Sequence, residues 1–249
     1  LINKITMMVS VVSSLAIFFL LGIIPITFGL LIRIFVNQSQ NRRIYSQSLT
    51  FGIVLAFFLD FVINSSQLGI NSGFSISSLL LVSSFIFGFL SSFFINEFTR
   101  LKSSFSYVFV ISFAIAYHSI AEGLIIGYDI NQLGLSLSAE RNIQLFSFLS
   151  HKIAEGFIIP GFFLLSISQL LSFATIASFP ILIGYFLGVY DFPGIISSIF
   201  FAISSGGLMF FIINWNNYIK TIPNQKNYHF LIVLIGFLLI YIAGLLHSL

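Results

Sequence analysis

Two short stretches of this chain carry the same chemistry-bearing pattern. The sequences HSIAEG at 118–123 and HKIAEG at 151–156 each place a glutamate four residues after a histidine. Positions i and i+4 of a helix lie on one face about one turn apart, so each stretch presents an imidazole and a carboxylate together. Divalent transition metals accept such ligands, with zinc the first choice and iron or manganese alternatives. The pattern predicts a metal site formed by four side chains: His118, Glu122, His151 and Glu155.

The elements that position these pairs belong to a chain too apolar to build a soluble surface. Of its 249 residues, 58% are hydrophobic and only 7% are charged, whereas a soluble domain carries about 25% charged residues. We expect an all-α integral membrane protein with one transmembrane domain over residues 1–249. The absence of cysteine excludes a disulfide framework and a thiolate metal site. The formal charge of +3 does not indicate a nucleic-acid partner, because its placement matters more than its sum.

Polar breaks divide the chain into apolar runs, each long enough for a spanning helix of about 20 residues. The first run contains Pro25, which predicts a tilt or kink. It is too long for the apolar core of a secretory signal, so we interpret it as a span. The least marked break lies near 166–169. We expect eight spans, at 8–35, 48–66, 74–96, 105–128, 141–166, 168–190, 194–215 and 228–248.

The basic residues orient these spans. Only Lys4 and Arg141 fall on one side of the expected bundle. Because basic residues accumulate in cytoplasmic loops, the other side is cytoplasmic and both termini lie outside. The cytoplasmic loops hold seven basic residues: Arg33, Arg42, Arg43, Arg100, Lys102, Lys220 and Lys226.

The orientation makes spans four and five antiparallel. Span four runs outward, which places Glu122 outside His118, and span five runs inward, which places His151 outside Glu155. At each level a histidine of one span then faces a glutamate of the other. Ionisable residues inside a membrane usually face a cavity or one another, and these four side chains can converge on one ion.

Further polar residues extend this stripe toward the outer surface. They predict a polar track down to the site, although helix capping and the ordinary tolerance of serine in spans account equally well for each residue alone. The track consists of Asp129 on span four and of Gln144 and Ser147 on span five.

Eight spans, external termini and an H-x-x-x-E-G frame on spans four and five resemble the ZIP family (Zrt/Irt-like proteins) of divalent metal transporters. The resemblance covers the whole chain in topology, but its specific part is the two hexapeptides. It implies that zinc, iron or manganese moves into the cytosol as the transported substrate, with no cofactor and no enzymatic activity. The family's principal metal site then corresponds to His118, Glu122, His151 and Glu155.

The chain also departs from that family pattern. Many relatives have Asn after the first histidine and Asn, Asp or Glu after the second, which creates a second metal site, but Ser119 and Lys152 stand here. The ammonium of Lys152 can reach Glu155 three residues on and hold it ionised, which favours a single-metal centre. Asp60 replaces a histidine common in span two; it either lines the same cavity or pairs with Lys152.

Other functions fit the residues less well or stay open. Haem ligation by His118 and His151 would put two carboxylates against the iron, and neither hexapeptide has the H-E-x-x-H pattern of a metalloprotease. A proton-coupled transporter or channel that uses the His–Glu pairs as a proton relay stays open as the alternative. We expect a multi-pass protein of the plasma membrane that works by alternating access. A homodimer is left open as its assembly.

Overall fold

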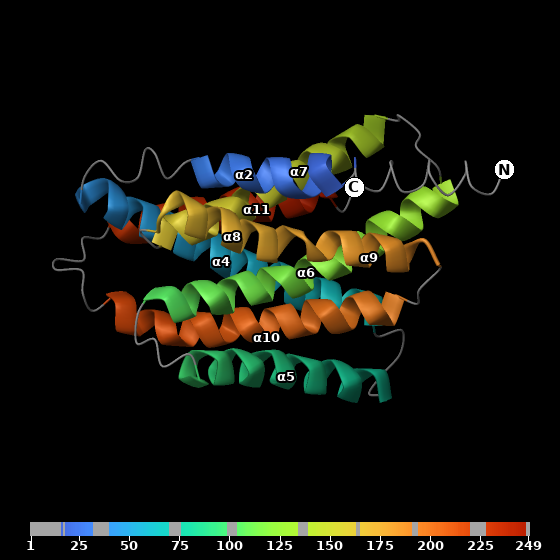
Figure 1. The fold of residues 1–249 in the computed structure, drawn as a ribbon, viewed down its shortest axis with the longest axis horizontal. Helices are drawn as coiled ribbons and strands as arrows, with labels where there is room; N and C mark the ends of the chain where they lie inside the picture. The colour runs from blue at the N-terminus through green and yellow to red at the C-terminus, as the bar shows by residue number, and fades with distance from the viewer. Residues whose placement is uncertain are drawn as a thin grey trace.

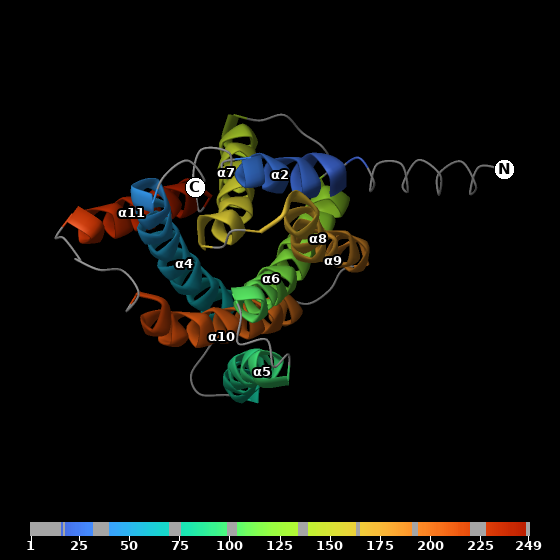
Figure 2. The same ribbon diagram turned by 60° about the vertical axis from the view of Figure 1, so that its left-hand side comes forward.

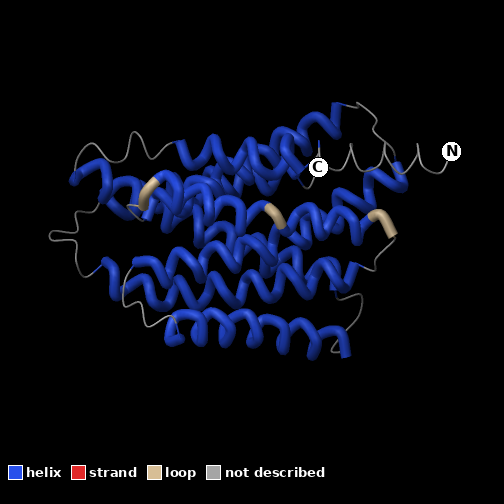
Figure 3. The backbone as a smooth tube through the Cα atoms, viewed as in Figure 1, coloured by secondary structure: helices blue, strands red, loops and turns tan. Residues whose placement is uncertain are grey.

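The computed structural model of the chain consists almost entirely of helices (Figure 1; Figure 3). The structure describes residues 16, 18–31, 40–69, 76–98, 104–133, 139–162, 165–190, 194–219 and 228–247. The elements are the π-helix η1 (Phe18–Ile23) and the α-helices α2 (Ile24–Leu31), α4 (Gln40–Gly69), α5 (Ile76–Phe98), α6 (Ser104–Leu133), α7 (Ala139–Phe162), α8 (Ile167–Ser178), α9 (Pro180–Gly188), α10 (Gly194–Ile219) and α11 (Tyr228–His247). No strand occurs among these residues.

Five helical stretches are long and apolar enough to cross a membrane. They are 42–67, 76–98, 107–129, 167–188 and 194–215. Two shorter apolar helices cover 19–31 and 229–245. The expected all-α class and multi-pass membrane character are therefore confirmed for the described part of the chain.

The helices run side by side along the long axis of the molecule (Figure 1). α6 packs chiefly on α9 and α10, while α7 packs on α2, α11 and α4. α5 lies outside the bundle against α10, and both ribbon views show it there (Figure 2). Side chains rather than close backbone packing therefore join α6 to α7, which are the helices that carry the two hexapeptides.

The first described helical segment is irregular just before Pro25; the tilt or kink itself stays a prediction. The chain forms the π-helical segment η1 directly before α2, and Pro25 is the second residue of α2. Proline lacks an N–H, and its ring clashes with the carbonyl four residues earlier. A local π-helical widening of this kind accommodates such an interruption.

The expected sixth span, 168–190, corresponds to the apolar stretch 167–188, which consists of the two helices α8 and α9. Its start is sharp, because the Ser166 hydroxyl accepts from the Gln169 N–H while the Gln169 side chain accepts from the Ser166 N–H, a capping box. Pro180 then stands at the first turn of α9 and cannot donate a hydrogen bond to the preceding turn, so α8 ends at Ser178.

Several helices continue past the apolar limits that the sequence suggested. α4 begins at Gln40 rather than at 48. In this added polar segment, Ser46 and Gln47 donate side-chain hydrogen bonds to the carbonyls of Gly161 and Phe162, each at 3.3 Å. The last carbonyls of a helix have no partner within it. The N-terminal part of α4 therefore provides hydrogen-bond donors for the backbone carbonyls at the C-terminal end of α7.

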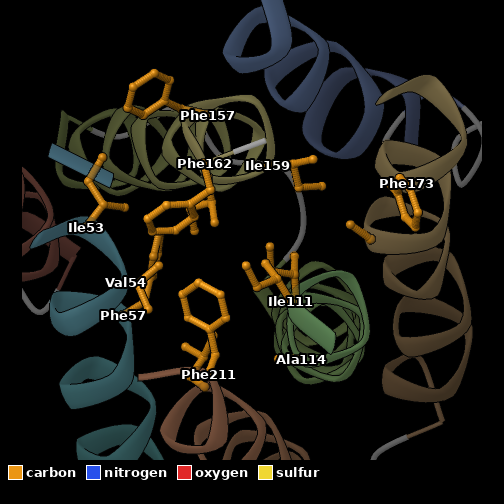
Figure 4. Close-up of a cluster of buried hydrophobic side chains, with 14 of the residues drawn as sticks. Ile53, Val54, Phe57, Ile111, Ala114, Phe157, Ile159, Phe162, Phe173 and Phe211 are labelled. Atoms are coloured by element: carbon orange, nitrogen blue, oxygen red, sulfur yellow. The ribbon is translucent and has the colours of Figure 1, made fainter. Parts of the chain in front are cut away.

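A buried apolar core joins most of these helices beside that end of α7 (Figure 4). The core also includes residues of α2 and α11. Figure 4 shows the part where side chains of α4, α6, α7, α8 and α10 converge. Representative members are Val54, Ile111, Phe162, Phe173 and Phe211. This core closes the space between α6 and α7 on the side of the α6 N-terminus.

Candidate metal centre

The structure brings the two His–Glu pairs together. His118 and Glu122 come from α6, and His151 and Glu155 come from α7; one ligand atom from each lies within 4.8 Å of all the others. His118 Nε2 lies 3.1 Å from Glu122 Oε1 and 3.3 Å from Glu155 Oε1, and His151 Nε2 lies 3.9 Å from Glu155 Oε1. The cross-helix meeting of His118 with Glu155 is the one that the antiparallel reading predicted.

These separations suit a small cation. Zinc–ligand distances of about 2.0 Å in a tetrahedron place neighbouring ligand atoms about 3.3 Å apart. The shorter contacts already match this spacing, and the widest requires a contraction of about 1.5 Å. Two imidazoles and two carboxylates therefore form a nitrogen–oxygen donor set that can hold a divalent metal.

His118 supplies an independent sign of an ion ligand. Its side chain is buried, with 1% exposure, and neither ring nitrogen makes a hydrogen bond within the described part of the chain. Buried polar atoms are nearly always satisfied. An imidazole nitrogen that faces two carboxylate oxygens without hydrogen-bond geometry fits a metal ligand better than a hydrogen-bonded core residue.

Glycine residues allow α2 and α9 to pack closely against the two helices that carry the ligands. A β-carbon on Gly156, directly after Glu155, would collide with the backbone carbonyl of Ile26 in α2. A β-carbon on Gly123, directly after Glu122, would likewise collide with the carbonyl of Ile181 in α9. The closing glycine of each hexapeptide therefore permits backbone contact just behind the site.

Lys152 joins the centre from α7 and is fully buried. Its ammonium lies 3.1 Å from Ser119 Oγ and 2.8 Å from Glu155 Oε2, and it also pairs with Glu122 Oε2. The predicted contact with Glu155 is present, while Ser119 and Glu122 were not predicted as partners. An ammonium has three N–H donors, and here it meets three acceptor side chains.

Two phenylalanines that the sequence did not single out pack against the imidazoles. Phe61 of α4 stacks on His118 at a centroid distance of 3.9 Å and an interplanar angle of 24°. Phe57, one turn earlier, meets His151 edge-on at 4.3 Å. Both phenylalanines are 1% exposed. They form the wall of the site on the α4 side and restrict the orientation of both rings.

Access to the centre is uneven. Glu122 and His151 are each 9% exposed, whereas His118 and Glu155 are each 1% exposed. The less buried pair lies toward the C-terminal end of α6, and the more buried pair lies toward the apolar core. The site therefore approaches solvent from one direction.

The remaining predicted residues lie farther from the ligands or are otherwise engaged. Asp129 is exposed near the end of α6. The Ser147 hydroxyl donates to the carbonyl of Ala243 in α11. Asp60 Oδ1 lies 3.7 Å from the place that a β-carbon on Gly244 of α11 would occupy. The side chain of Gln144 falls outside the described residues. A role for these residues in a metal path stays a prediction.

Comparisons with known proteins add no assignment to this geometry. No family model matches the chain, and a search of curated proteins also finds no match. The resemblance of the two hexapeptides to the ZIP family therefore stays a prediction.

Proposed function

We propose that this protein is a ZIP-like transporter that moves a divalent transition metal, zinc first, into the cytosol by alternating access. The observation that carries the proposal is the convergence of four ligand side chains from two helices inside a bundle of apolar helices. Ionisable residues in such a place are costly and mark ion pathways. The proposal includes eight spans, external termini, a location in the plasma membrane and no catalytic activity.

The uneven burial supports a direction of entry. Glu122 and His151, the more exposed ligands, lie on the side that the charge distribution assigns to the exterior. On the opposite side, Phe162 packs on Phe211 and Trp215 with centroid distances of 5.2 and 4.4 Å. Metal would enter from the side of Asp129, and release would require this aromatic contact to open.

The chain of ion pairs favours one other function. His118, Glu155 and Lys152 are in continuous contact, so a proton relay that serves another substrate is the second candidate. The two candidates respond differently to acid. Metal must displace protons from the imidazoles, so metal affinity falls as the pH is lowered. A relay would move protons with no metal present.

The test is metal entry into proteoliposomes loaded with a metal-sensitive dye. We expect the native protein to admit Zn²⁺, and we expect His118→Ala and Glu155→Ala to abolish entry because each removes a ligand. Glu97→Ala is the matched control, since Glu97 is an exposed carboxylate at the end of α5. Equal uptake by native protein and both site variants would show that the hexapeptides are structural. Parallel runs with Fe²⁺ and Mn²⁺ would define selectivity.

A further inference from the structure

At each carboxylate of the centre, Oε1 faces an imidazole and Oε2 contacts Lys152; Oε1 of Glu155 contacts the lysine as well. Oε1 of Glu122 and Oε1 of Glu155 face the imidazoles, at 3.1 and 3.3 Å from His118 Nε2. Oε2 of both residues contacts the ammonium of Lys152. Lys152 also lies 2.9 Å from Glu155 Oε1. A metal held by the imidazoles and the Oε1 atoms would therefore leave the lysine its contacts with the Oε2 atoms.

The lysine is also fixed in this place. Its three acceptor partners match the three donors of an ammonium, and its 0% exposure leaves no route for the head group to reach solvent. The ring of Phe148 lies 5.8 Å away on a further side. Lys152 shares α7 with His151 and Glu155, so it remains with the centre in any movement of that helix.

A fixed lysine changes the charge of the centre in a specific way. With neutral imidazoles, two carboxylates and one ammonium leave a single negative charge, and a bound divalent metal turns it into a single positive charge. Without the lysine, the metal-free centre would carry two negative charges and the loaded centre none. The cost of enclosing a charge in a medium of low dielectric constant grows with its square, so the doubly charged state costs about four times as much as a singly charged one.

We propose that Lys152 is a resident counter-ion that lets the centre reorient without cargo, so that the protein performs net metal transport rather than metal-for-metal exchange. This inference rests on the proposed transport function. Every alternation between the two sides passes through a state in which the centre is sealed from water. With Lys152 present, the loaded and metal-free centres carry charges of equal size through that state. Without Lys152, only the metal-loaded centre would pass readily through the sealed state. The centre could then return to the first side only with a metal ion picked up on the second side.

The experiment compares two rates in the same proteoliposomes, under a voltage clamp set by potassium and valinomycin. The first is net Zn²⁺ entry into vesicles without internal zinc, and the second is exchange of external radioactive zinc for internal unlabelled zinc. Their ratio does not depend on the amount of folded protein. We expect Lys152→Met to lower the ratio of net entry to exchange about tenfold or more relative to the native protein, since about 1.4 kcal/mol at the sealed state gives this factor.

Two further variants separate charge from shape. Lys152→Arg keeps the positive charge and should hold the ratio near the native value. Arg43→Gln removes an exposed positive charge of α4 and should not change the ratio. A native ratio in Lys152→Met, or a ratio in Lys152→Arg as low as in Lys152→Met, would overturn the inference.

If Lys152→Met cannot be reconstituted, the two zinc fluxes of the native protein alone test the inference. We expect its net entry to proceed without internal metal at a rate comparable to exchange. Native protein that takes up zinc only when zinc is also inside would overturn the counter-ion inference and leave the transport proposal standing. Native protein with no zinc flux in either mode would instead overturn the proposed function itself.

Discussion

The helices α6 and α7 meet through opposite chemistry in their two halves. In one half, His118 of α6 lies 3.3 Å from Glu155 of α7, and Lys152 bridges two carboxylates. In the other half, Phe162 of α7 packs into the apolar core with Ile111 of α6 (Figure 4). No more than two helical turns separate the polar centre from this core along either helix.

This contrast suggests that the two halves have different roles, one in ion binding and one in stability. The polar half holds imidazole and carboxylate side chains that could bind a cation, but their burial is costly and each depends on its partners. The aromatic half contributes close packing and excludes water, and it needs no particular partner atoms. Substitutions in the two halves should therefore separate ion binding from stability.

The largest expected effect concerns the polar half. Glu155→Gln removes one metal ligand and leaves Lys152 with one fewer carboxylate. We expect zinc affinity, measured by equilibrium dialysis of the purified protein, to fall by about 100-fold or more, beyond the usual effect of an outer-shell residue. Glu97→Gln should not alter it, because Glu97 is exposed on α5. Equal affinities in the two variants would remove Glu155 from the ligand set.

The opposite result is expected in the aromatic half. Phe162→Ala opens a cavity in the core and should lower the free energy of unfolding by about 3 kcal/mol, measured by denaturant titration in detergent. Its zinc affinity should stay at the native value, since Phe162 provides no ligand. Phe98→Ala is the matched control, because Phe98 is 80% exposed. A loss of affinity as large as that of Glu155→Gln would show that the two halves are not separable.

A third substitution tests the support behind the polar half. Gly156→Ala forces a β-carbon against the carbonyl of Ile26, and the resulting shift should cost about 1–3 kcal/mol of stability. At Gly244 a β-carbon would meet its nearest atom at 3.7 Å, an ordinary contact. Gly244→Ala should therefore be neutral or slightly stabilising in the same denaturant titration. Similar losses in both variants would mean that the α2–α7 contact is not tight.

The smallest expected effect concerns the phenylalanine wall on the α4 side of the polar half. Phe61→Leu removes the ring that stacks on His118, an interaction worth about 1 kcal/mol. Zinc affinity should fall about fivefold in the same dialysis experiment. Phe94→Leu, at an exposed position of α5, serves as the control. An unchanged affinity would indicate that the glutamates alone orient the imidazole.

Much of the centre could be predicted from the sequence because helix periodicity determines it. An i, i+4 spacing places His118 beside Glu122 in any helix. Antiparallel spans then bring the second pair, His151 and Glu155, to the depth of the first pair in the membrane. The contact of Lys152 with Glu155 follows from an i, i+3 spacing in the same way. Its contact with Glu122 depends on how α6 and α7 are rotated about their axes, which spacing does not define.

The phenylalanine wall and the helix boundaries were harder to predict, for different reasons. The chain has 33 phenylalanines, so Phe57 and Phe61 look no different in sequence from lipid-facing residues. Apolar runs mark only the part of a helix inside the membrane, which explains why the polar start of α4 was missed. Pro180 was visible in the sequence, but the apolar run continues across it, and the division into α8 and α9 did not follow from hydropathy.

The polarity of α7 has a consequence for the assembly of the protein in the membrane. Among the described helices, α7 is not one of those long and apolar enough to span a bilayer, and it carries Lys152 and Glu155. Charged residues at the centre of a helix oppose its transfer from the translocon into lipid. Part of this energetic cost is offset only when Glu122 of α6 pairs with Lys152. Helix α7 should therefore leave the translocon together with α6 as a hairpin, so the charged residues of the proposed metal centre would also influence the order of membrane insertion.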